Sequence, residues 1–235
     1  MTTPKLFIAV NRNKGILIAV SMISIWCIVL YLNLNQGFSW SDPLSYLRLL
    51  IQTHLFTGLF ITAHDAMHGT VAPNSLKVNH FIGRICTLLF IFNSYKALYP
   101  KHHLHHQHAG TSSDPDFHKG NSNVALWYFD FLKEYISWKQ ILLAAITFNL
   151  AKLWFTDQAL IAYWIIPSLL ATFQLFYFGT YRPHKGQHDD TNPHNARSQS
   201  KNHLLAFLSC YFFGYHFEHH DSPATAWWQL WQLKE

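Results

Sequence analysis

Long apolar stretches alternate with short polar segments along this chain. A bilayer core of about 30 Å needs roughly 17 to 25 mostly apolar residues in one helix. Four segments meet or approach this requirement, and they are residues 16–32, 44–66, 138–155 and 159–179. Only residues 156–158 separate the last two, so we expect these two to form an antiparallel pair. The pattern predicts an all-α integral membrane protein with about four transmembrane helices.

Two features refine these spans. The first segment follows Arg12 and Lys14, and no small-residue cleavage site comes after it. We therefore expect a retained helix rather than a signal peptide, with the amino terminus on the cytoplasmic side. Within the last segment, Pro167 predicts a kink, because proline lacks the backbone N–H of a regular helix.

The composition agrees with a membrane protein that carries a polar, histidine-rich part. Only 12% of the residues are charged, about half the share of a typical soluble domain. The basic residues form no stripe of the kind that nucleic-acid binding requires. The three cysteines are isolated, which argues against a disulfide framework or a zinc–thiolate site. The 17 histidines lie in separate short clusters, so neither a tag nor a low-complexity tract explains them.

Three of the histidine clusters have helical spacing. His64 and His68 lie four residues apart at the end of the second span, which places both rings on one helix face. This pair alone is a weak signal. Two further clusters share the pattern His-x-x-His-His, and they are His102, His105 and His106, and then His216, His219 and His220.

The repeated pattern suits two metal ions. Rings three or four residues apart share a face, whereas adjacent rings diverge by about 100° on a helix, so one ring of each adjacent pair can point to each metal. Eight imidazoles are too many for one tetrahedral zinc site. Imidazole alone does not choose between iron, zinc, copper and nickel.

The chain offers additional ligands and bystanders. His184 follows the fourth span and is the best candidate for a ninth ligand. For His194 an ordering role in its loop remains an equal alternative, and His108 is either a ligand or a neighbour of one. His103 lies off the shared face and is expected to be a bystander.

Four carboxylates lie close to the histidine clusters. Ligating histidines usually pass their second ring N–H to a carboxylate or carbonyl oxygen, and this is our hypothesis for Asp65 and Glu218. Asp114 and Asp116 are further candidates for the active site, with a solvated Asp-Pro-Asp turn as the alternative.

The segment 81–99 decides whether one site can collect all clusters. As a helix it would be about 28 Å long, enough to cross, but it contains Arg84, Asn93 and Lys96. If it crossed, the clusters before and after it would lie on opposite sides. We therefore interpret it as interfacial or re-entrant, and we interpret residues 124–135 as interfacial too. All histidine clusters then face the cytoplasm, together with all 17 lysines and arginines except Arg48 and Lys152.

The histidine clusters and the sequence motifs around them resemble those of a known family. They are similar to the histidine boxes of the membrane-bound fatty-acid desaturase and hydroxylase superfamily, and within it to the bacterial β-carotene ketolases. The similarity rests on His64-Asp-Ala-Met-His68-Gly-Thr, His108-Ala-Gly-Thr with Asp114-Pro-Asp116-Phe, Phe178-Gly-Thr-Tyr-Arg-Pro-His184, His194-Asn-Ala-Arg-Ser and Gly214-Tyr-His216-Phe-Glu-His219-His220.

The resemblance implies a reaction and its requirements. Such enzymes hold two non-haem irons and use O2 with electrons from a ferredoxin-type donor. The ketolases oxidise C4 of the β-ionone ring of a carotenoid, giving echinenone and canthaxanthin from β-carotene. The whole chain, residues 1–235, would then form one membrane-bound oxygenase domain in the lipid bilayer, without a nucleic-acid partner.

Two kinds of rival remain open. A carotenoid ring hydroxylase or a fatty-acyl desaturase would use similar histidine boxes, although the longer sequence motifs favour a ketolase. A membrane metal transporter is the alternative outside the enzyme class. It would place its ligands along a path through the membrane, whereas here the clusters are predicted to gather at one face.

Overall fold

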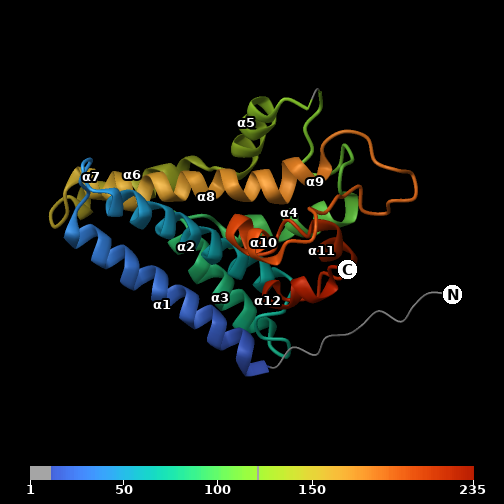
Figure 1. Ribbon diagram of the computed structural model, residues 1–235, viewed down its shortest axis with the longest axis horizontal. Helices are drawn as coiled ribbons and strands as arrows, with labels where there is room; N and C mark the ends of the chain where they lie inside the picture. The colour runs from blue at the N-terminus through green and yellow to red at the C-terminus, as the bar shows by residue number, and fades with distance from the viewer. Residues whose placement is uncertain (1–11, 121) are drawn as a thin grey trace.

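The computed structural model describes residues 12–120 and 122–235, and every regular element within these ranges is helical (Figure 1). Helix α1 (Arg12–Gln36) and helix α2 (Pro43–Met67) run antiparallel to each other. A third long rod runs alongside α2 from residue 157 to residue 184. Among the described residues, these three helices are long and apolar enough to cross a membrane. The predicted all-α fold of a membrane protein is confirmed.

Helices α1 and α2 approach closely at a glycine. A Cβ added to Gly58 would lie 2.5 Å from Sδ of Met22, so a larger residue would require the Met22 side chain to shift. Trp26 and Phe56 pack edge to face beside it, with ring centroids 5.2 Å apart. The outer face of α1 exposes apolar side chains such as Leu17 and Ile28, as expected for contact with lipid.

The third rod joins five short elements without a break. They are α7 (Asp157–Leu160), the π-helical turn η1 (Ile161–Ile165), α8 (Ile166–Phe176), the π-helical turn η2 (Tyr177–Tyr181) and α9 (Arg182–His184). Pro167 is the second residue after the first π turn, so the helix geometry changes where the sequence predicts a kink. The rod ends at His184, beside the histidine clusters.

The helix in the predicted span 138–155 is shorter than expected. Helix α6 (Trp138–Ala151) has 14 residues and is therefore about 21 Å long, less than a bilayer core. It turns back into α7, and Nζ of Lys152 lies 2.9 Å from Oδ2 of Asp157 at the turn. Ile141 and Leu150 on α6 are exposed, which suits contact with lipid. The antiparallel pair is observed, while the number of crossings stays a prediction.

The segment 81–99 is not one helix. Helix α3 (Leu76–Leu89) ends before a sharp turn, and helix α4 (Tyr95–His108) returns from it. Ile91 and Phe92 both have positive φ, of 50° and 57°, in this turn. Bulky residues adopt this conformation at a cost of about 1–3 kcal/mol each, so tertiary packing must hold the reversal. The reversal brings α4 back to the carboxyl end of α2.

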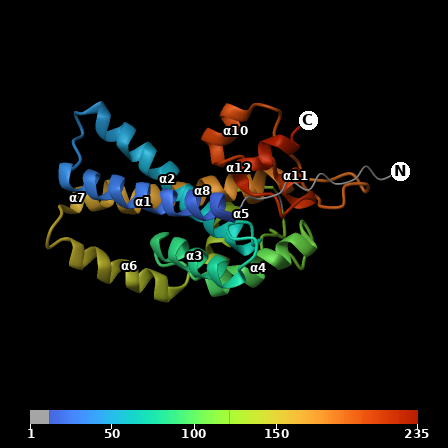
Figure 2. The same cartoon turned by 90° about the horizontal axis from the view of Figure 1, so that it is seen from below.

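The remaining elements cover the histidine end of the rods. Helix α5 (Val124–Tyr135) lies across α8, at the bounds predicted for an interfacial helix. A long loop after α9 leads to α10 (His203–Cys210), α11 (His216–Asp221), α12 (Trp227–Leu230) and the 3-10 turn η3 (Trp231–Leu233), which gather on one side of the rods (Figure 2). The amino terminus, for which the sequence predicts a cytoplasmic location, lies outside the described residues.

Candidate metal centre

Nine imidazoles from four helices meet in two groups. The first group has nitrogen atoms that all lie within 4.8 Å of one another, and it consists of His64, His68, His102, His106 and His219. The second group meets the same limit and consists of His105, His184, His216 and His220. These nine are the residues that the sequence predicts as ligands, including His184 as the ninth. Their binding of a metal stays a prediction.

Helical spacing sorts the rings between the groups. On α4, His102 and His106 are four residues apart and join the first group, whereas His105 points to the second. On α11, His216 and His220 join the second group, and the residue between them, His219, joins the first. Adjacent rings on one helix thus reach different groups, as the divergence of about 100° requires.

The contacts in the first group fit a shared cation. Nε2 of His219 lies 3.1 Å from Nε2 of His64 and 3.0 Å from Nε2 of His106. Nε2 of His102 lies 2.6 Å from Nε2 of His68. With metal–imidazole bonds of about 2.1 Å, two nitrogens at right angles on one ion would be about 3.0 Å apart. A neutral Nε2 acts either as donor or as acceptor, so hydrogen bonds cannot satisfy three converging rings equally.

The second group shows the same geometry. Nε2 of His216 lies 3.0 Å from Nε2 of His184 and 3.0 Å from Nε2 of His220. Nε2 of His105 is buried and has no hydrogen-bond partner among the described residues. A cation between the four nitrogens would use every one of these lone pairs. The donor set of both groups therefore fits metal ions.

Two rings of the second group are held through their other nitrogen. Nδ1 of His105 donates to Oδ1 of Asp114 over 2.9 Å, and Nδ1 of His184 donates to the carbonyl of Asn195 over 2.7 Å. These bonds fix the tautomer that leaves Nε2 free, which is the usual arrangement around metal-binding histidines. In the first group, Oδ1 of Asp65 lies 3.5 Å from Nδ1 of His64, an ion-pair distance without hydrogen-bond geometry.

Burial keeps most of these rings neutral. Burial, with a smaller effect of neighbouring imidazoles, lowers the pKa of His106 to about 2 and the pKa values of His102 and His219 well below their ordinary range. Neutral rings retain the lone pair that a metal requires. His105 differs, because the charge of Asp116 and the hydrogen bond to Asp114 outweigh burial and raise its pKa.

The Asp-Pro-Asp segment is not a solvated turn. Asp114 is 5% exposed, and it also accepts hydrogen bonds from the backbone N–H of Gly110 and of Asp116, each over 2.8 Å. The interaction with His105 outweighs burial and lowers the pKa of Asp114, so this carboxylate is ionised. It is therefore a fixed acceptor for the His105 ring.

Asp116 lies at the edge of the second group. Its carboxylate accepts hydrogen bonds from the hydroxyls of Tyr135 and Thr180, and its Oδ2 lies 3.8 Å from Nδ1 of His105. Burial raises the pKa of Asp116 despite the opposing effect of His105. No sequence pattern marked Tyr135 or Thr180 as a site residue. Thr180 nevertheless belongs to the sequence motif that ends at His184, whereas nothing in the sequence links Tyr135 to Asp116.

The other two carboxylates differ from each other. Asp65 is buried beside His64, and its Oδ2 accepts a hydrogen bond of 2.9 Å from the backbone N–H of Trp227. Glu218 instead accepts hydrogen bonds from the hydroxyl of Ser198 and, over 2.8 Å, from Nζ of Lys234. The expected contact of Glu218 with a ligating histidine is thus replaced by contacts to the carboxyl-terminal segment.

The remaining histidines lie outside the two groups. Nδ1 of His103 donates to the carbonyl of Tyr99 over 2.9 Å, in agreement with its expected role as a bystander. His108 is exposed. His194 lies against the second group, with its ring centroid 5.8 Å from that of His220, and Nε2 of His194 lies 3.5 Å from Oδ1 of Asp221.

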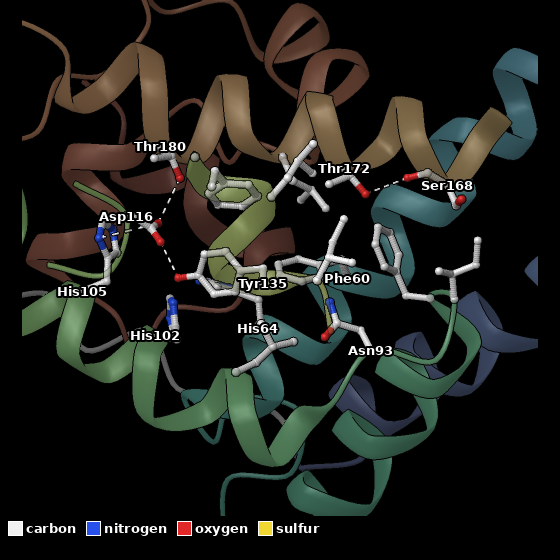
Figure 3. Close-up of a pocket in the computed structure, with 18 of the residues that line it drawn as sticks. Phe60, His64, Asn93, His102, His105, Asp116, Tyr135, Ser168, Thr172 and Thr180 are labelled. Carbon is white, nitrogen blue, oxygen red and sulfur yellow. Dashed lines mark hydrogen bonds and ion pairs between the residues drawn. The ribbon is translucent and has the colours of Figure 1, made fainter. Parts of the chain in front are cut away.

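An apolar cavity opens onto both groups (Figure 3). It encloses about 1010 Å³ of empty space, including the part that is open to the surroundings. His64 and His102 of the first group line it, as do His105 and His216 of the second. Most of the wall is apolar and includes Phe60, Phe90, Phe131, Leu169 and Leu175.

The cavity follows the third rod. Thr180 lies at its histidine end, beside Asp116, and Ser168 lies at the opposite end (Figure 3). The two residues are 12 positions apart, which corresponds to about 18 Å along a helix. The cavity therefore suits a long, narrow, apolar molecule with one end next to the histidines.

Comparisons with known proteins agree with this site. The family model described as fatty acid desaturase matches residues 41–138 and 124–235. A protein of Paracoccus sp. (strain PC1) named beta-carotene ketolase is 42% identical over 190 residues, covering 80% of this chain and 78% of that protein. No solved structure matches.

Two further relatives extend the similarity over 92% of this chain. A protein of Protosiphon botryoides named beta-carotene 4-ketolase is 35% identical, and a protein of Chlamydomonas reinhardtii named zeaxanthin 4-ketolase is 36% identical. The matches span 62% and 52% of the lengths of these two proteins. The chain therefore belongs to the fatty acid desaturase family, and its similarity within that family is to carotenoid ketolases.

Proposed function

We propose that this protein is an integral-membrane carotenoid ketolase that holds two non-haem irons and converts the C4 methylene of a β-ionone ring to a ketone. One observation carries the proposal: two imidazole groups open onto one apolar cavity, in a chain that is 42% identical to a protein named beta-carotene ketolase. The whole chain, residues 1–235, acts as a single domain.

Each imidazole group holds one iron in this proposal. The five rings of the first group, which include His219, form one site. The four rings of the second group, which include His216, form the other. The irons, when bound, supply the activation of O2 with electrons from outside the protein. The protein contributes neutral imidazoles at fixed positions, and the Asp114 carboxylate holds the His105 ring in the required tautomer.

The reaction balances as two hydroxylations at one carbon. Each hydroxylation consumes one O2, two electrons and two protons, inserts one oxygen atom into a C–H bond and releases one water. The second hydroxylation gives a geminal diol, which loses water to leave the ketone. The C4 hydrogens are allylic, so their C–H bonds are weaker than those of an ordinary methylene.

The cavity selects and places the substrate. A carotenoid is apolar and dissolves in the bilayer, so a cavity with walls such as Phe60, Phe131 and Leu175 accepts it without desolvating polar groups. The histidine end of the cavity receives the ring, and the polyene extends along the third rod towards Ser168. Asp116, held by Tyr135 and Thr180, provides a polar wall beside the reacting end.

The four candidate carboxylates take different parts in this proposal. Asp114 orients His105, Asp65 lies next to His64, and Asp116 lines the cavity. Glu218 fixes the carboxyl-terminal segment through Ser198 and Lys234, and so supports α11 rather than a single ring.

The topology follows from the distribution of basic residues. The metal centre and the amino terminus face the cytoplasm, because nearly all lysines and arginines fall on that side of the predicted spans. A ferredoxin-type donor would deliver electrons from the same compartment. The protein is therefore a multi-pass membrane protein with its substrate in the lipid and its reductant in water.

Expression in cells that make β-carotene tests the proposed function. We expect echinenone and canthaxanthin as products, and about two irons per purified chain. Hydroxylated carotenoids without ketones would identify a ring hydroxylase instead, and altered acyl chains would identify a desaturase. Metal uptake without any carotenoid product would favour a transporter.

A further inference from the structure

A basic hollow lies behind the second imidazole group. It is lined by Arg182, Lys185 and Arg197, with Gln199 and Gly214 at its base. Pro183 also lines it and directly precedes His184, while Gly214 lies two residues before His216. The hollow is separate from the apolar cavity and shares no lining residue with it.

The base of the hollow contains an unsatisfied amide. Gln199 is only 6% exposed, yet neither the nitrogen nor the oxygen of its side chain has a hydrogen-bond partner among the described residues. A Cβ added to Gly214 would lie 2.2 Å from Oε1 of Gln199, so the amide rests directly on the glycine backbone. A buried amide without partners is unfavourable, and a ligand with oxygen atoms would accept hydrogen bonds from its NH2 group.

The three cations around this amide have no acidic partner within the described part of the chain. Among the described residues, Arg182, Lys185 and Arg197 form no ion pair within 4.0 Å. The guanidinium of Arg197 is fixed by the backbone carbonyls of Lys185 and Gln187, which leaves its charge uncompensated. The nearby Glu218 is neutralised by Lys234. The hollow therefore has a positive potential and suits an anion.

The position of the hollow identifies the source of the anion. Arg182 and Lys185 lie at the end of the third rod, where a spanning helix leaves the hydrocarbon core and meets lipid headgroups. Helix α10 begins four residues after Gln199, and its exposed face carries Leu204, Leu205 and Leu208. These leucines are 70%, 56% and 56% exposed, as expected for a short helix that rests on acyl chains.

We propose that this hollow binds the phosphate group of an anionic phospholipid. The cations and the Gln199 amide would bind the phosphate oxygens, and the acyl chains would lie along α10. The proposal requires a protein in a membrane but not the carotenoid reaction. The bound lipid would hold α9 and the segment before α11 together behind the metal centre.

Purified holoenzyme in detergent provides the test. We expect short-chain phosphatidylglycerol to raise Tm, whereas equal concentrations of short-chain phosphatidylcholine or inorganic phosphate raise it much less. Replacing both Arg182 and Lys185 with Gln should weaken phosphatidylglycerol binding about tenfold or more. Replacement of the exposed Lys77, which lies outside the hollow, with Gln should leave binding unchanged.

A second variant and a second measurement keep the test decisive. Gln199→Met preserves the side-chain length but removes the amide, and it should reduce the number of lipids retained per chain in native mass spectrometry without lowering metal content. Equal stabilisation by both lipids, or an unchanged response in the double variant, would overturn the proposal. An equal shift with inorganic phosphate would overturn the lipid source. If the double variant loses turnover with an acidic electron carrier and still retains its lipid, the hollow binds the electron carrier and the lipid proposal is overturned.

Discussion

The rings of His105 and His106 lie 5.8 Å apart at an angle of 78°, and each belongs to a different imidazole group. Neighbours in the chain thus serve different candidate irons. One turn of α4 ties the two sites together, because any rotation of the helix would move both rings at once.

Substitutions on α4 should separate ligands from bystanders. We expect His105→Ala and His106→Ala each to abolish ketone formation and to lower the iron content of the purified protein. His103→Ala is the matched control on the same helix, since Nδ1 of His103 bonds to a backbone carbonyl and His103 belongs to neither imidazole group. It should keep iron and activity within about twofold. Full iron content in His105→Ala, measured by elemental analysis, would contradict the assignment.

The carboxylate of Asp114 should matter for metal affinity. Asp114→Asn keeps an oxygen near Nδ1 of His105 but removes the negative charge that fixes the tautomer. We expect iron affinity, measured by competition with a chelator, to fall about 10- to 100-fold. Asp157→Asn, at the other end of the third rod, should leave affinity unchanged. Equal affinities for the two variants would mean that Asp114 does not act through the ring.

Glu218 should affect stability more than metal binding. Its partners, Ser198 and Lys234, belong to other segments, and the side chains of Glu218 and Lys234 are 15% and 18% exposed. We expect Glu218→Gln to cost about 1–2 kcal/mol and to lower Tm while the iron content is retained. Adding Lys234→Met to Glu218→Gln should lower the free energy of unfolding only slightly further, because the two residues share one contact. Loss of iron in Glu218→Gln at unchanged Tm would restore the role beside a histidine.

The wall of the apolar cavity should control access of the carotenoid. Thr172 lines the cavity and Leu170, on the same helix, does not. We expect Thr172→Trp to lower kcat/KM by about tenfold or more while iron content is unchanged, since the indole fills the space for the polyene. Leu170 faces outwards and is 41% exposed, so Leu170→Trp should have little effect on kcat/KM. Similar losses in both variants would indicate general damage to α8.

The topology can be tested with single cysteines. In a Cys27→Ser background, Ser39→Cys lies in an exposed position between α1 and α2, and Ser200→Cys lies in one between α9 and α10. We expect an impermeant thiol reagent to label the first from outside the cell and the second only after permeabilisation. Labelling of both from one side would contradict the predicted arrangement.

The sequence predicts the histidine groups well because helical periodicity is local. The sorting of His102, His105 and His106 depends only on their spacing within one helix. The reversal at Ile91 and Phe92 has no such local signal, since neither residue favours positive φ. Only the polar residues of the segment and the need to unite the clusters argued against a single span.

Long-range contacts explain what the sequence does not reveal. The bond between Tyr135 and Asp116 joins α5 to the segment after α4, and nothing in either segment specifies that pairing. Glu218 is adjacent to a histidine in sequence, but the returning carboxyl-terminal segment brings Lys234 to it. The short length of α6 likewise depends on where the chain turns towards α7 rather than on the extent of the apolar run.

The contact between His64 and His219 joins residues that are 155 positions apart in the chain. Neither imidazole group is complete until α11 has been synthesised, because that helix contributes rings to both. In the proposed di-iron enzyme, complete iron sites would therefore form only after translation has passed α11. A nascent chain halted before residue 216 would already span the bilayer and yet remain unable to mature.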